Sequence, residues 1–133
     1  MVAPVSSPLS AADILATYQS VVRRAIDVFT AIIALYEPDI HSERDWADIT
    51  VSQATTQREG LQQRLFSTSI KEAHALTLMG TLGHYLDAHW ADYERLMPDP
   101  AKRQQVEQLH AQLKALMDET IPIIKILRQQ ERG

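Results

Sequence analysis

The segment GTLGHYLDAHW, residues 80–90, concentrates side chains that could do chemistry: two histidines, an aspartate and two aromatic residues. Imidazoles are the commonest metal ligands in proteins, so the spacing of the histidines decides whether they can share one ion. Each residue of a helix advances by about 100°, which turns His84 and His89 about 140° apart. Paired ligands of the HExxH type need a spacing of four residues instead. The two histidines therefore do not form a metal motif with each other.

His89 is the stronger candidate, because it falls within the expected apolar stripe of its helix. That stripe comprises Ala75, Met79, Leu82 and Leu86. When the chain is folded into antiparallel helices, this histidine comes level with Asp48 on one neighbour and with Glu107 and His110 on another. Glu-x-x-His is the unit of di-iron carboxylate bundles, which need two such units and two further glutamates. We therefore predict no cofactor and a hydrogen-bonded core histidine, with a transition-metal site built from these four residues as the alternative.

The segment RQQVEQLH, residues 103–110, combines an arginine with a histidine. It resembles the R-x(4–6)-H motif of the HEPN ribonucleases, which are all-helical and of similar size, over eight residues with two identities. The resemblance implies that Arg103 and His110 act on an RNA backbone across a dimer. Gln104 departs from the family, in which Asn or Asp commonly follows the arginine. The structural alternative is a solvated ladder of ion pairs formed by Arg103, Glu107, His110 and Lys114.

Gly80 and Gly83 indicate close packing. Each glycine in a helix interior lowers stability by about 1 kcal/mol relative to alanine, so its presence suggests that a larger side chain does not fit there. They lie away from the expected apolar stripe, beside Leu76, and His84 and Asp87 flank them. Glycine permits the close approach of another backbone or a ligand. We predict that this face binds a partner helix. The alternative is that the first helix of the same chain packs closely against it.

The elements that must position these residues are helices, because helical periodicity dominates the apolar pattern. The expected helices cover residues 10–37, 42–66 and 69–97, and a fourth begins at residue 99. Short links make neighbouring helices antiparallel. We therefore predict an all-α, single-domain, antiparallel up-down-up-down four-helix bundle over residues 10–133, after a disordered lead-in at residues 1–9.

Local signals mark the ends and weak points of these helices. Capping boxes, in which side chains three residues apart bond backbone amides, are expected at Ser10–Asp13 and Ser69–Glu72. The second helix has a thin apolar stripe and contains Gly60, so a break near its middle is open. Pro122 is expected to bend or interrupt the fourth helix, because its ring clashes with the preceding turn.

The composition narrows the classes of partner. The chain has 133 residues, a formal net charge of −4 and no cysteine. Nucleic-acid binding needs clustered Lys and Arg on phosphates, so a mildly acidic chain predicts no nucleic-acid partner. Disulfides and thiolate sites are excluded. No apolar run reaches the length of a membrane span and the N-terminus lacks a signal-peptide pattern, so we expect a cytoplasmic protein without a membrane partner.

The predicted function is a non-enzymatic helical interaction or regulatory module, mainly because catalytic motifs are absent. The first helix carries apolar residues on more than one face, among them Val21, Val28 and Leu35. Large exposed apolar patches are rare on monomers, so a second apolar face indicates a protein partner or a homodimer through the first or third helix. The alternative is a metal-binding bundle or a HEPN-like RNA-cleaving enzyme.

Overall fold

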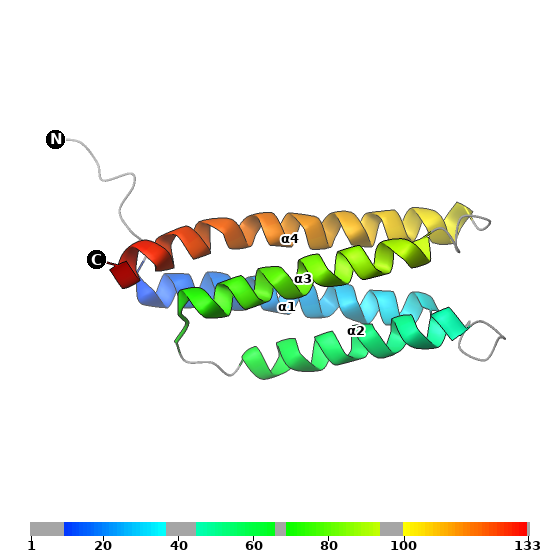
Figure 1. The fold of residues 1–133 in the computed structure, drawn as a ribbon, viewed down its shortest axis with the longest axis horizontal. Coiled ribbons are helices and arrows are strands. Elements are labelled where there is room, and N and C mark those ends of the chain that lie inside the picture. Colours follow the sequence, from blue (N-terminus) through cyan, green and yellow to red (C-terminus); the bar gives the residue numbers. More distant parts are fainter. Residues whose placement is uncertain (1–9, 37–44, 66–68, 94–99, 133) are drawn as a thin grey trace.

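The computed structural model describes the backbone of residues 10–36, 45–65, 69–93 and 100–132, and their side chains except those of residues 45–50 and 88–93. The predicted lead-in at residues 1–9 lies outside this part. The helices are α1 (Ala11–Tyr36), α2 (Asp45–Arg64), α3 (Glu72–Tyr93) and α4 (Pro100–Arg132). They lie side by side in one compact body (Figure 1). Because the described residues contain no strand, the all-α prediction is confirmed.

α1 and α2 meet with their residue order reversed. Between α1 and α2, the Gln19 side chain donates to the Leu65 carbonyl at 3.4 Å and Arg58 donates to the Thr30 hydroxyl at 3.4 Å. The colours of Figure 1 likewise run in alternating directions from one helix to the next. α1 packs along both α2 and α4, and α3 packs along α4, whereas α2 and α3 touch over a smaller area.

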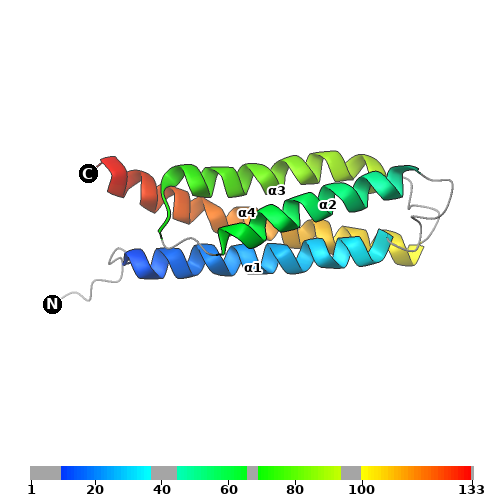
Figure 2. The ribbon, with the colours of Figure 1, turned by 90° about the horizontal axis from the view of Figure 1, so that it is seen from below.

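α1 and α3 lie on opposite sides of the bundle, with α2 in front of the space between them and α4 behind it (Figure 2). Aromatic side chains connect α1 and α3 across the core. The Phe29 and Tyr85 rings meet edge to face, with centroids 4.9 Å apart and an interplanar angle of 89°. Such pairs contribute about 0.5–1.5 kcal/mol beyond the area that they bury. The core is therefore continuous from α1 to α3.

The apolar residues of α1 pack mainly against other helices of the same chain. Val21 and Val28 are buried and Leu35 is half-buried, because α1 has neighbours on two sides. Much of the second apolar face that suggested a dimer contact on the first helix is thus covered by the protein's own helices.

The first capping box forms as predicted. The Asp13 amide donates to the Ser10 hydroxyl at 3.1 Å, and the Ser10 amide donates to the Asp13 carboxylate at 3.3 Å. α2 runs without a break from Asp45 to Arg64. α4 continues through Pro122, so the predicted interruption does not occur. Pro122 and Asp118, whose carbonyl loses its partner to the proline, are both exposed, and water can satisfy that carbonyl.

The start of α3 was predicted wrongly. The helix begins at Glu72, three residues after the position expected from Ser69. The Lys71 amide donates to the His74 Nδ1 atom at 2.9 Å, and the Glu72 amide donates to the Glu131 carboxylate at 2.8 Å. The last turns of α4 therefore supply the cap, and Glu72 itself pairs with Arg128 at 2.8 Å.

Candidate interaction surface on α3 and α4

α3 and α4 pack tightly against each other at Gly83. A Cβ atom added to this glycine would lie 3.1 Å from the Cε atom of Met117, so α4 fills the space that a larger side chain would need. Residues three and four apart on a helix share a side. Gly80 and Leu76 therefore continue this side of α3, and Ile121 continues the facing side of α4. We call these five residues the α3–α4 seam.

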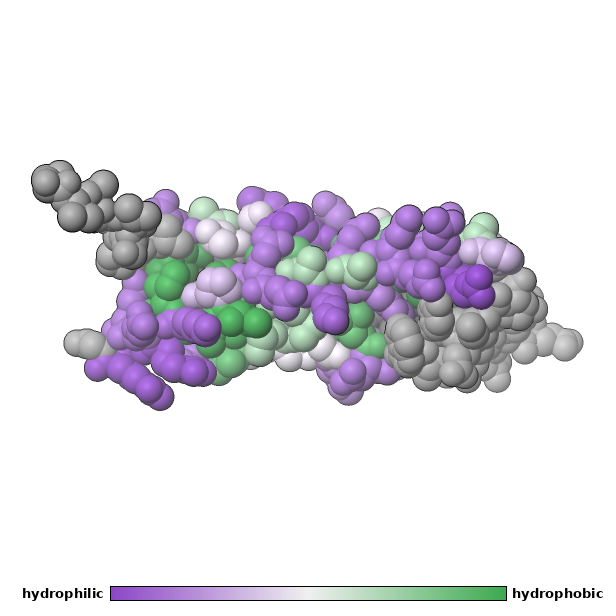
Figure 3. Space-filling view, turned by 90° about the horizontal axis from the view of Figure 1, so that it is seen from above, coloured by the Kyte–Doolittle hydropathy of each residue, from purple (hydrophilic) through white to green (hydrophobic). Residues whose placement is uncertain are grey.

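Large hydrophobic side chains are exposed at the seam. Within the described part of the chain they are Leu76, which is 39% exposed, and Ile121, which is 40% exposed. Gly80 has no side chain, and a Cβ atom added to it would meet no atom within 4 Å, so the surface one turn from Leu76 is open; we call this opening the notch at Gly80. On the side of the molecule formed by α4, hydrophobic residues gather in the half nearest the start of α1 (Figure 3). The seam thus combines protruding apolar side chains with a recess.

A cavity of about 260 Å³ continues the seam toward the start of α4. Its lining residues are Leu86, Asp87, His110, Ala111 and Lys114. His110 is 7% exposed, and burial lowers the pKa of its imidazole, because the charged form loses its hydration. Asp87 and Lys114 are exposed and stand on the α3 and α4 sides of the opening.

The structure brings most of the predicted binding face together. Leu76, Gly80, His84 and Asp87 are all exposed on α3. Gly83 differs, because it is half-buried beneath Met117. The helix that packs closely there is α4 and not the first helix, which was the alternative considered for this face.

The predicted metal ligands are only partly described. Glu107 is exposed and His110 is buried, one turn further along α4. His89 lies in α3 and Asp48 lies in α2, but both side chains are outside the described part. Among the described side chains, no three of His, Cys, Asp or Glu converge as metal ligands would. The transition-metal site stays a prediction.

The catalytic pair implied by the ribonuclease resemblance lies along one helix. Arg103 is half-buried and precedes His110 by two turns of α4, about 10 Å along the axis. Arg103 does not line the cavity that contains His110. The HEPN-like reading also stays a prediction.

Sequence reasoning missed the contribution of α4 to this surface. Met117 and Ile121 lie outside the main apolar stripe of the helix, four residues apart. That spacing places them on one side of the helix. This feature of the sequence could have predicted a second apolar strip on α4.

No known protein family matches the chain, and no curated protein or solved structure is significantly similar to it. The described helices include none with the length and apolar character of a membrane span.

Proposed function

We propose that this chain is a non-enzymatic protein–protein interaction module, an antiparallel up-down-up-down four-helix bundle of the cytoplasm that binds a second copy of itself through the α3–α4 seam. The observation that carries the proposal is the exposure of Leu76 and Ile121 beside the open notch at Gly80. Large contiguous apolar patches are rare on monomeric proteins, and the grouping of Leu76 and Ile121 on one side of the molecule favours a protein partner.

A second copy fits the shape of the seam. A two-fold dimer uses the same patch on both subunits, which requires the patch to be complementary to itself. Leu76 and Ile121 protrude and Gly80 is recessed, so each subunit offers both a knob and a hole. In a symmetric contact, Leu76 of one subunit enters the notch at Gly80 of the partner subunit.

The charges at the two ends of the seam favour an antiparallel contact. Glu72 pairs with Arg128, which sets the level of the helices, so the exposed Lys125 lies near the Leu76 end of the seam. The exposed Asp87 lies at the other end. The two-fold axis that this contact needs lies between the levels of Leu76 and Gly80, and it brings Lys125 of one subunit toward the end of the partner subunit's seam that carries Asp87. Complementary charges fix register and suppress wrong pairings.

Light scattering coupled to size exclusion tests the proposal. We expect about twice the chain mass of 15.0 kDa for the native protein. Leu76→Glu and Ile121→Glu should each yield monomer, because a carboxylate in an apolar interface is costly. Ala16→Glu, at an exposed position of α1, should leave the dimer intact. Far-UV circular dichroism checks that the variants fold. A native protein that remains monomeric at high micromolar concentration would refute self-association.

A further inference from the structure

A second groove runs along the opposite side of α4, where that helix packs against α1. It consists of two adjoining cavities of about 430 and 550 Å³, and both are lined by Ala31, Leu109 and Gln112. Because these residues are shared, the cavities form one continuous depression, which we call the α1–α4 groove. It extends along α1 from Arg24 to Leu35, about 16 Å at the rise of a helix.

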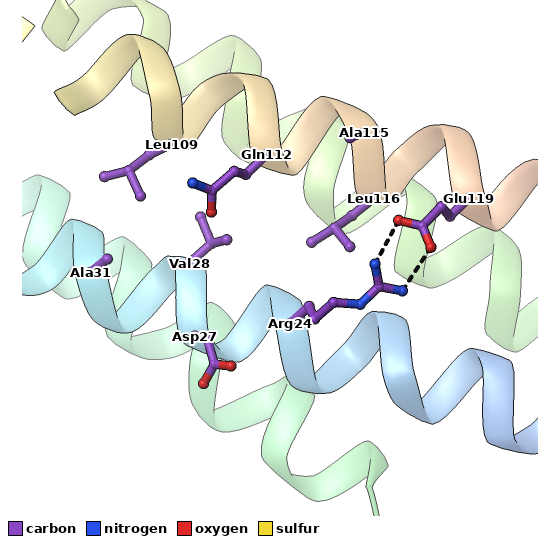
Figure 4. A pocket seen from close by; sticks show the side chains of 9 residues that line it. All are labelled: Arg24, Asp27, Val28, Ala31, Leu109, Gln112, Ala115, Leu116 and Glu119. Carbon is purple, nitrogen blue, oxygen red and sulfur yellow. Dashed lines mark hydrogen bonds and ion pairs between the residues drawn. The ribbon is translucent and has the colours of Figure 1, made fainter. Parts of the chain in front are cut away.

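The groove has an apolar floor and low walls. Val28, Leu109 and Leu116 project between the two helices, the Gln112 amide lies beside Val28, and the small side chain of Ala31 leaves the α1 wall low (Figure 4). Lining positions recur every three or four residues on both helices, as in surfaces that receive a third helix. The shape therefore matches the binding mode in which an amphipathic helix lays its apolar face into a groove.

One end of the groove is held by a fixed ion pair. The Arg24 guanidinium donates two hydrogen bonds of 2.7 Å to the Glu119 carboxylate, as Figure 4 shows. These charges satisfy each other and close the groove at this end. Asp27, which also lines the groove, is exposed and has no ion pair or hydrogen bond to any described residue. Its carboxylate points away from α4, on the outer side of α1 (Figure 4), where a cation on an incoming helix that overlaps α1 can reach it.

We infer that the α1–α4 groove binds an amphipathic helix of a different protein, with about three turns of large aliphatic residues and a basic residue that reaches Asp27. A concave groove is a poor match for a second copy of itself, since two depressions placed face to face leave a void. The site is separate from the α3–α4 seam, because the residues of α4 that line it face α1.

A pair of synthetic peptides tests this inference. Both carry leucines at i, i+4, i+7 and i+11 on an otherwise Ala/Gln helix, and they differ by one arginine or one glutamate at the end nearest Asp27. We expect fluorescence anisotropy to show that the arginine peptide binds about two- to fivefold more tightly, the range for an exposed ion pair. Asp27→Asn should remove this preference while leaving the binding of both peptides measurable.

Filling the groove provides the second arm of the test. Ala31→Phe places an aromatic ring where both cavities meet and should abolish peptide binding. Ala16→Phe, exposed on the same helix outside the groove, should bind normally. Leu76→Glu should bind normally as well, which separates this inference from the proposed dimer. Equal binding by Ala31→Phe and the native protein, or no binding by the native protein, would overturn the inference.

Discussion

His110 keeps its imidazole inside the protein, between α3 and α4, beside a cavity that also contacts Asp87 and Lys114. Burial lowers the pKa of this imidazole, whereas the unfolded chain restores a value of about 6.5. Near and below that pH the unfolded state binds the proton more readily than the folded state. The free energy of unfolding must therefore decrease as the pH falls through about 6.5, until the folded protein also becomes protonated.

We predict that His110→Gln flattens this pH dependence, because the substitution removes the titrating group. The free energy of unfolding is measured by urea unfolding between about pH 8 and pH 5. Most carboxylates titrate below this range, so they contribute little to the slope. His84→Gln is the matched control, because His84 is exposed on α3, and it should retain the slope of the native protein. If His110→Gln loses stability with falling pH as steeply as the native protein does, burial of this imidazole is not the cause of the slope.

At the scale of the helices, local sequence predicted what neighbouring residues control and failed where distant residues decide. The Ser10–Asp13 box forms because both partners lie within one turn. The start of α3 could not be predicted in the same way, because its cap comes from Glu131, which is 59 residues away. No pattern in residues 69–75 reveals a carboxylate that only the packed α4 delivers.

The orientation of α3 shows the same limit for the candidate site. Ala75 and Leu82 were correctly assigned to the core, but Leu78 and Tyr85 are buried there, while Met79 and Leu86 are only half-buried. The periodicity of the sequence identifies which residues of a helix form an apolar face. It does not show which part of that face packs against each neighbouring helix. The residues of the predicted face on α3 are exposed except Gly83, and binding by this face stays a prediction. Met117 and Ile121 were missed because they belong to another helix.

We predict that Glu131→Gln weakens the junction of α3 and α4. The carboxylate accepts the Glu72 amide at the start of α3, where the helix dipole favours negative charge, a contribution of about 0.3–1 kcal/mol. Urea unfolding should show a loss of about that size, and amide exchange in the first turn of α3 should accelerate. Glu59→Gln, exposed on α2, is the control with the same chemistry. Equal stability of the two variants would contradict the capping role.

At the scale of the molecule, α4 separates two surfaces of different character. On one side, the α3–α4 seam presents protruding Leu76 and Ile121. On the other, the α1–α4 groove is recessed and apolar at its base. α1 and α3 lie diagonally across the core (Figure 2), so a ligand on one surface leaves the other open. The geometry therefore allows one bundle to dimerise and still bind a helix of another protein.

Self-association through the seam has a consequence for thermal stability. Binding that occurs only between folded chains stabilises them by mass action, so the Tm must rise with protein concentration. We predict that the native protein shows this rise in calorimetric scans at increasing concentration. Leu76→Glu should show a Tm independent of concentration, because its seam cannot pair, while Ala16→Glu should behave like the native protein. Ala31→Phe should also keep the concentration dependence, since the groove does not form the dimer. If the Tm of the native protein is constant over a hundredfold range of concentration, the seam does not mediate self-association. Its exposed residues would then be expected to contact a different protein.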